Sequence, residues 1–220
     1  MNPGRAQVLT CPHCGGKKEV ISLISGNTFG RIVWSDRRVY TPMLPEPSFV
    51  QKCPHCGKYF LTSRQETHEF ASTISFDKGE LPYAELKEAW KQLSQEDLTQ
   101  EERTHILDMQ VWDFNNEYTR PGAERALTED QEEKSDVVKK EIPAEEHEYL
   151  VSIVRLLQNT CAIDNLFKAE LLREIGEFDE ALKHLDSYET DIDFWKNVKE
   201  KTREKIEAHD TLPFIILGGV

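Results

Sequence analysis

The chain after residue 80 has apolar residues at every third or fourth position, a pattern that predicts amphipathic helices. The first predicted helix begins at Pro82 and ends near Ser94, because proline is favoured in the first helical turn. Thr99 and Glu102 have the spacing of a capping box and open a longer helix that ends before Pro121. The apolar stripes of these two helices are Tyr83, Leu86, Trp90 and Leu93, then Leu107, Val111, Phe114 and Tyr118.

The same periodicity predicts four more helices in the last third of the chain. They begin near Ile142, Ala162, Phe178 and Ile192. The stretch 123–140 is charged and poor in large apolar residues, which favours a mobile or marginally helical connection.

The first 60 residues have short strand-like runs instead, so the chain as a whole is predicted to be α+β. The runs are Glu19–Ile24, Phe29–Trp34, Val39–Tyr40 and Phe49–Lys52, and turn residues separate the first three. Three prolines at 42, 45 and 47 predict an extended connection before the last run.

The string CPHCG occurs twice, at residues 11–15 and 53–57. Each CxxC pair supplies two thiolates, and two pairs supply the four ligands of a closed tetrahedral Zn²⁺ site: Cys11, Cys14, Cys53 and Cys56. Two alternatives remain, a thiol oxidoreductase and a set of structural disulfides. The strand-like runs after each motif disfavour the first, since a redox CxxC opens a helix, and the absence of a signal peptide disfavours the second. His13 and His55 lie between the cysteines and are expected to face solvent.

These paired motifs resemble those of the zinc-ribbon family, in which two knuckles at the ends of β-hairpins hold one zinc. The resemblance covers residues 1–62 and implies that the metal supplies much of the stability of this region, since structural zinc contributes about 10–16 kcal/mol in small metal-folded peptides. The predicted organisation is a ribbon at 1–62, a linker at 63–80, a helical domain at 81–212 and a tail at 213–220.

Residues 162–190 resemble the helical hairpin of a tetratricopeptide repeat. Ala169, Gly176, Phe178 and Ala181 match the small, turn and aromatic positions of that family, whereas Tyr188 stands where a small residue is expected. One such unit is present, and the helix at 192–208 would cap it. The resemblance implies binding of proteins or peptides.

Charge is divided unevenly along the chain. Residues 1–62 have eight basic and three acidic residues, whereas the remainder has 19 basic and 37 acidic residues, within a net charge of −13. A basic ribbon allows a second hypothesis, a nucleic-acid-binding regulator that uses Lys17, Lys18, Arg31, Arg37, Arg38 and Lys52, with stacking by Trp34, Tyr40, Tyr59 and Phe60. The acidic remainder would repel a polyanion. The favoured alternative is therefore that the ribbon docks against the chain's own acidic helices or faces a protein, and that its aromatic residues fill a small core.

No enzyme motif is present: the sequence has no phosphate loop, no GxSxG, no HExxH and no dinucleotide fingerprint. Cys161 is expected to be a buried, inert thiol. No apolar run approaches the roughly 18 residues of a membrane span. The sequence thus predicts a cytoplasmic, non-enzymatic zinc protein that binds protein or peptide partners and no small-molecule substrate.

Overall fold

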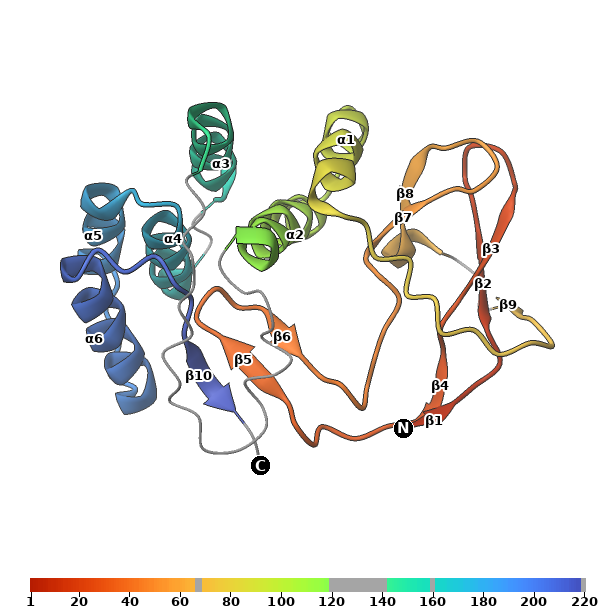
Figure 1. The fold of residues 1–220 in the computed structure, drawn as a ribbon, viewed down its shortest axis with the longest axis horizontal. Coiled ribbons are helices and arrows are strands. Elements are labelled where there is room, and N and C mark those ends of the chain that lie inside the picture. The colour runs from red at the N-terminus through yellow and green to blue at the C-terminus, as the bar shows by residue number, and fades with distance from the viewer. Residues whose placement is uncertain (66–68, 119–141, 159–160, 219–220) are drawn as a thin grey trace. The chain divides into compact units, whose positions relative to one another are not determined.

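The computed structural model describes residues 1–65, 69–118, 142–158 and 161–218. The fold is α+β, as predicted, with small sheets in the N-terminal part and helices in the C-terminal part (Figure 1). It divides into unit 1, which contains Met1–Arg31 and Thr41–Gln110, and unit 2, which contains Ile32–Tyr40 and Val111–Gly219. No described helix is long and apolar enough to cross a membrane. The connection predicted at 123–140 lies outside the described residues.

Two antiparallel hairpins of unit 1 carry the CPHCG motifs at their turns. Strands β2 (Gln7–Thr10) and β3 (Lys17–Val20) form the first hairpin, and β7 (Val50–Lys52) and β8 (Tyr59–Leu61) form the second. Thr10 pairs with Lys17 in the first, and Lys52, 42 positions later, pairs with Tyr59 in the second. The two hairpins therefore have the same register around the same motif.

Of the remaining strands of unit 1, one extends the first hairpin and two form a separate two-stranded sheet. Strand β9 (Glu69–Phe70) pairs with β2, and β1 (Asn2–Pro3) pairs with β4 (Leu23–Ser25). The single strand predicted at 19–24 is thus two strands. Ile21 lies between these two strands. Its N–H donates to the carbonyl of Asp77 over 2.7 Å and therefore does not take part in strand pairing.

Helices α1 (Tyr83–Leu93) and the first part of α2 (Gln100–Tyr118) belong to unit 1. The predicted capping box is present: the N–H of Glu102 donates to Thr99 Oγ1 over 3.1 Å, and the N–H of Thr99 donates to Glu102 Oε2 over 3.0 Å. The helices and the second hairpin share one apolar core, formed by Val50, Tyr59, Leu61, Leu81, Leu86, Ala89, Leu93, Leu98 and Ile106. Strand β9 and all but the first residue of the 3₁₀ turn Thr62–Arg64 lie in the segment 63–80, which was assigned above to a linker.

Unit 2 contains a three-stranded sheet in the order β10-β5-β6. Strands β5 (Ile32–Trp34) and β6 (Val39–Tyr40) form a tight hairpin. The strand predicted at 29–34 begins only at Ile32 and is therefore shorter than expected. Strand β10 (Ile215–Gly218) pairs antiparallel with β5. Residues assigned above to a tail therefore form part of a sheet, through a pairing that joins distant parts of the sequence.

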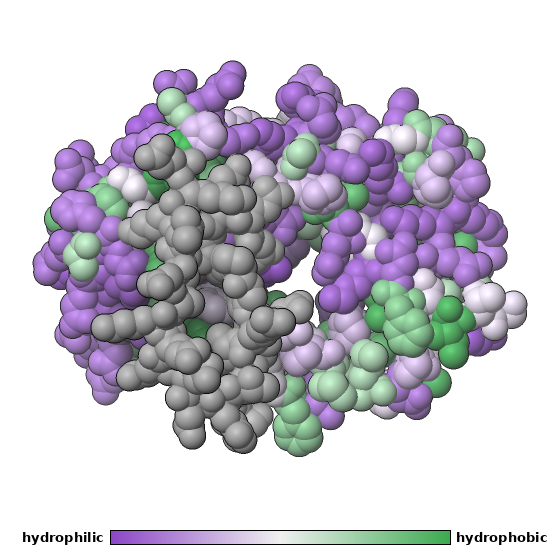
Figure 2. Space-filling model, in the orientation of Figure 1, coloured by the Kyte–Doolittle hydropathy of each residue, from purple (hydrophilic) through white to green (hydrophobic). Residues whose placement is uncertain are grey.

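Four helices of unit 2 follow one another along the chain: α3 (Ala144–Leu156), α4 (Ala162–Glu174), α5 (Phe178–Asp186) and α6 (Asp193–Glu207). Helices α4, α5 and α6 pack side by side (Figure 1). Ala169 and Ala181, where the sequence predicts close contact between α4 and α5, are both fully buried. Hydrophilic side chains cover most of the face of α5 and α6 seen in Figure 2.

The turn between α4 and α5 has the hydrogen bonds of a Schellman motif. The N–H of Gly176 donates to the carbonyl of Arg173 over 3.0 Å, and that of Glu177 donates to Leu172 over 2.8 Å. Gly176 has a φ of +90°, a left-handed conformation that glycine adopts without steric cost. The glycine that the sequence places at this turn thus ends α4.

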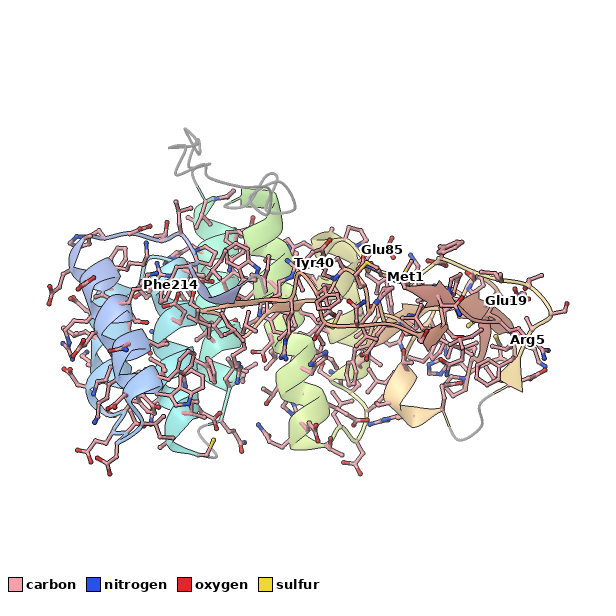
Figure 3. All side chains as sticks on the ribbon, turned by 90° about the horizontal axis from the view of Figure 1, so that it is seen from below. Met1, Arg5, Glu19, Tyr40, Glu85 and Phe214 are labelled. Carbon is pink, nitrogen blue, oxygen red and sulfur yellow. The ribbon has the colours of Figure 1, made fainter. Side chains whose placement is uncertain are left out.

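A buried guanidinium connects α4 to the segment before β10. Arg173 is fully buried, forms an ion pair with Glu170, and donates to the carbonyls of Asp210 and, over 3.1 Å, Leu212. Its guanidinium carbon also lies 5.9 Å from the ring centroid of Phe214, a residue labelled in Figure 3. This charged side chain, and not only apolar packing, holds the end of unit 2 in place.

Candidate metal centre

The backbone turns in the same way at each CPHCG motif. The N–H of Cys11 donates to the carbonyl of Gly16 over 2.9 Å, and the N–H of Cys53 donates to the carbonyl of Lys58 over the same distance. These bonds continue the antiparallel ladders of the two hairpins into the turns. Each turn therefore holds its two cysteines at the end of a paired, rigid element.

A left-handed glycine closes each turn. Gly15 has a φ of +71° and Gly57 a φ of +73°, and the N–H of each donates back to the carbonyl of the first cysteine in its motif. A side chain at either position would strain the backbone, because L-residues rarely adopt this conformation. The glycine after each CPHC string is thus required by the shape of the knuckle.

The structure brings all four predicted cysteines together. Their Sγ atoms lie within 4.8 Å of one another, with 3.7 Å between Cys11 and Cys56 and 3.6 Å between Cys14 and Cys53. A zinc ion with bonds of about 2.3 Å to four tetrahedral sulfurs would separate them by about 3.8 Å. The donor set and its spacing therefore fit a tetrahedral metal ion, and all four cysteines are free thiols.

Burial divides the four cysteines into two inner and two outer residues. Cys11 and Cys53, the first cysteine of each motif, are 2% and 1% exposed, whereas Cys14 and Cys56 are exposed. The inner pair belongs to a small core with Leu9, Val20 and Phe60. The metal centre is thus enclosed by apolar side chains on one side and reaches the surface on the other.

Burial and local hydrogen bonds shift the pKa values of Cys11, Cys14 and Cys53 in different directions. Burial raises the pKa of Cys53, but the N–H groups of Cys56 and His55 outweigh it and lower that pKa to about 6. The N–H of Gly16 lowers the pKa of Cys14. Hydrogen bonds with the neighbouring thiols, together with burial, outweigh this effect and raise the pKa to about 12. Burial also raises the pKa of Cys11. A divalent cation would reverse this balance, since its charge displaces the thiol protons.

His13 and His55 are exposed, as expected, and each also bridges to the opposite hairpin. His13 Nε2 lies 2.9 Å from the carbonyl oxygen of Tyr59, and His55 Nε2 lies 3.1 Å from that of Lys17. Since a carbonyl oxygen only accepts, both rings must carry the proton on Nε2. Tyr59 follows Lys17 by 42 residues, so the two bridges are equivalent. They fix the angle between the hairpins without contributing a metal ligand.

Sequence reasoning missed these bridges, because they join residues more than 35 positions apart. It also missed Gln92 of α1, whose side chain pairs with the backbone of Tyr59 in both directions, over 3.0 and 2.9 Å. The side-chain amide of Gln92 thus pairs with the backbone of β8 as a neighbouring strand would. The string CPHCG recurs after 42 residues, the same interval that separates Lys17 from Tyr59. This repetition was the one signal in the sequence that could have indicated two equivalent histidine bridges.

The six predicted basic residues do not all belong to one unit. Lys17, Lys18, Arg31 and Lys52 are in unit 1, and Arg37 and Arg38 are in unit 2. Three of them form ion pairs with acids of their own unit: Lys17 with Glu69 at 2.7 Å, Lys52 with Glu85 (labelled in Figure 3) at 2.8 Å, and Arg37 with Asp164 at 3.9 Å. Tyr59 and Phe60 are buried, which agrees with the expectation that these two aromatic residues fill a core.

The prediction for Cys161 was wrong. Its side chain is exposed, because the residue is the N-cap of α4 and not part of the helix's buried face. Its N–H donates to Asp164 Oδ2 over 2.9 Å. Free cysteines are usually buried, but an N-cap lies at the end of a helix, outside its buried face.

No protein-family model, no curated protein and no solved structure matches this chain. The case for its function therefore rests on the geometry of its own residues. Among the described residues, the four cysteines form the one group of three or more metal-ligating side chains close enough to hold an ion.

Proposed function

We propose that this protein is a non-enzymatic, zinc-binding protein-interaction module, in which Cys11, Cys14, Cys53 and Cys56 hold one Zn²⁺. The observation that carries the proposal is the convergence of four sulfurs within 4.8 Å, from two hairpins with the same register. Four thiolates are typical of structural zinc, because they leave no open position for substrate or water. The bound ion would supply charge neutralisation and cross-linking to the hairpins.

The equivalent hairpins also support membership of the zinc-ribbon family. In that interpretation the metal fixes the ribbon, and the ribbon is supported on one side by α1 through the shared core around Leu86. Thiolate ligands must remain reduced, which favours the cytoplasm as the location.

The helical hairpin of α4 and α5 supports the interaction role. Its two buried alanines and the left-handed Gly176 agree with a tetratricopeptide-like hairpin. Unit 2 also exposes large apolar side chains, with Leu156 at 50% and Ile192 at 60%. We infer that the helical unit binds a protein or peptide partner.

A nucleic-acid-binding role is the alternative, and the ion pairs of Lys17, Lys52 and Arg37 weigh against it. A cation already paired with a carboxylate must give up that contact before it can bind a phosphate. We infer that the basic residues mainly serve contacts within each unit.

Metal analysis of the purified chain tests the first part of the proposal. We expect one zinc per chain, and Co²⁺ substitution should give the absorption spectrum of a tetrahedral tetrathiolate site. Cys53→Ser should lower the zinc stoichiometry, whereas Cys161→Ser, the matched control, should leave it unchanged. A chain without metal, or an unchanged stoichiometry in Cys53→Ser, would contradict the proposal.

Binding measurements test the second part. The zinc-loaded chain should show no binding to random single-stranded DNA or RNA at moderate salt, and should enrich specific proteins from the native host. Replacing Leu156 and Ile192 by serine should reduce that enrichment without loss of zinc. Salt-sensitive nucleic-acid binding that is lost in Lys18→Ala with Arg31→Ala would favour the alternative.

A further inference from the structure

The inner and outer sulfurs of the metal centre differ in access to solvent. Cys11 and Cys53 are almost completely buried, whereas Cys14 and Cys56 are exposed. A dissolved oxidant therefore reaches the second cysteine of each motif and is excluded from the first. Oxidation of thiolates follows exposure as well as charge, so the two outer residues are the points of attack.

Each outer sulfur lies in close contact with the inner sulfur of the opposite hairpin. Cys14 Sγ is 3.6 Å from Cys53 Sγ, and Cys56 Sγ is 3.7 Å from Cys11 Sγ. Each close pair thus combines one exposed and one buried cysteine. We propose that a hydroperoxide oxidises Cys14 and Cys56, and that the products are two disulfides between the hairpins, Cys14–Cys53 and Cys11–Cys56. This inference rests on the metal site proposed above.

The chemistry is balanced for each pair. The outer thiolate attacks one peroxide oxygen, the O–O bond breaks, and the distal oxygen leaves as hydroxide, which gives a sulfenic acid. The inner thiolate then attacks that sulfur, an S–S bond forms, and the S–O bond breaks with loss of a second hydroxide. Two protons convert both hydroxides to water, and one peroxide accepts the two electrons. Two peroxides therefore oxidise all four cysteines.

The local structure allows the small movement that these bonds require. Gly15 and Gly57 directly follow the outer cysteines, and no atom lies within 4 Å of the position where a side chain would project from either glycine. The backbone beside each outer cysteine thus borders open space and not packed side chains. Disulfide sulfurs are poor metal ligands, because the thiolate is the binding form, so oxidation releases the ion. The new bonds would hold the hairpins together in its place.

The test uses the full-length Cys161→Ser chain loaded with zinc, because this variant removes the exposed thiol outside the site. Two equivalents of hydrogen peroxide are added, free zinc is followed with a chromogenic chelator, and remaining thiols are blocked with N-ethylmaleimide. Trypsin then cuts after Arg5 and Lys17 on one side and after Lys52 and Lys58 on the other. Cys11 and Cys14 lie in the first peptide, and Cys53 and Cys56 lie in the second.

We expect release of one zinc per chain and a single species that contains both tryptic peptides less four hydrogens. With one equivalent of peroxide, fragmentation of the joined peptides should locate Cys14–Cys53 or Cys11–Cys56. A thiol reductant should restore zinc binding. Separate peptides, each lighter by two hydrogens, would indicate disulfides within a motif and overturn the inference. A Cys14–Cys56 bond, or zinc retained after peroxide, would overturn it as well. A chain that takes up no zinc before oxidation would instead contradict the proposed function.

Discussion

The hairpins of unit 1 and the helices of unit 2 differ in what lies at their centres. In unit 1 the hairpins share a core of only five residues, two of which are the cysteines Cys11 and Cys53, and the second hairpin has a further core with α1. In unit 2 each of the helices α3 to α6 buries apolar side chains, from Leu150 of α3 to Ile206 of α6, and no cysteine is among them. If the proposed zinc ion is bound, we expect the hairpins to depend on it, whereas the helices are held by packing and by the buried charges of Arg173 and its partners.

Removal of the metal should have the largest effect. When a chelator removes the ion, we expect β2 and β3 to lose protection against amide hydrogen exchange, because their small core cannot replace the metal. Structural zinc contributes about 10–16 kcal/mol in small metal-folded peptides. Strands β7 and β8 should lose less protection, since Val50, Tyr59 and Leu61 also pack on α1. Helices α4 and α5 should remain protected.

Hydrogen exchange followed by mass spectrometry measures each of these segments in one experiment. Zinc-loaded Cys161→Ser provides the control, and its exchange pattern should match that of the natural sequence. Full protection of β2 and β3 in metal-free protein would remove the distinction between the two units.

Loss of the buried guanidinium should be the next largest effect, and it falls on unit 2. Arg173→Met should lower the free energy of unfolding by about 3–5 kcal/mol, because it leaves Glu170 and Glu174 buried without their cation. Arg173→Lys should cost less, since it retains the charge but not the planar fork. Urea unfolding monitored by circular dichroism gives both values.

Adding Glu170→Gln to Arg173→Met should recover part of the loss, because it removes one of the uncompensated carboxylates. Zinc content should be the same in all three variants. A cost for Arg173→Met within the error of the measurement would show that apolar packing alone holds unit 2.

Local patterns predicted much of this architecture, and distant pairings account for the rest. The apolar period located the helices within a few residues, and the two CPHCG strings located the four clustered cysteines. Strand β10 was missed because its partner β5 lies about 180 residues earlier. The ion pairs of Arg173 were missed for a related reason: nothing in the local sequence distinguishes a buried helical arginine from an exposed one. The exposure of Cys161 was missed because its position at the N-cap of α4 outweighs the usual burial of a cysteine.

Acid should weaken unit 1 through the capping box of α2. Hydrogen bonds from Arg64 lower the pKa of Glu102 to about 2, against the smaller opposing effect of burial. A carboxyl group whose pKa is lowered by folding stabilises the folded state above its usual pKa, here 4.5, and loses that contribution as the pH falls toward 2. The Arg64 side chain is 37% exposed, so screening reduces the contribution to about 1–2 kcal/mol.

Urea midpoints between pH 6 and pH 2.5 measure this contribution. Glu102→Gln should lower the midpoint at pH 6 and flatten its decline toward low pH. Glu101→Gln, one residue earlier in the same exposed turn, should behave like the natural sequence. Equal slopes for the two variants would exclude the Arg64 pair as the source of acid sensitivity.

The last predicted effect, similar in size to that of Glu102, concerns the turn between α4 and α5. Gly176→Ala should lower the stability of unit 2 by about 1–2 kcal/mol, because an L-residue at a φ of +90° is strained. No atom lies within 4 Å of the added methyl group, so the cost should be that of the backbone alone. Gly176→Asn is the matched variant, since asparagine tolerates left-handed conformations, and it should cost less. Both variants should bind zinc as before, because the turn belongs to the unit that packing stabilises; a lower zinc stoichiometry would mean that the stability of the helices and of the metal centre is coupled.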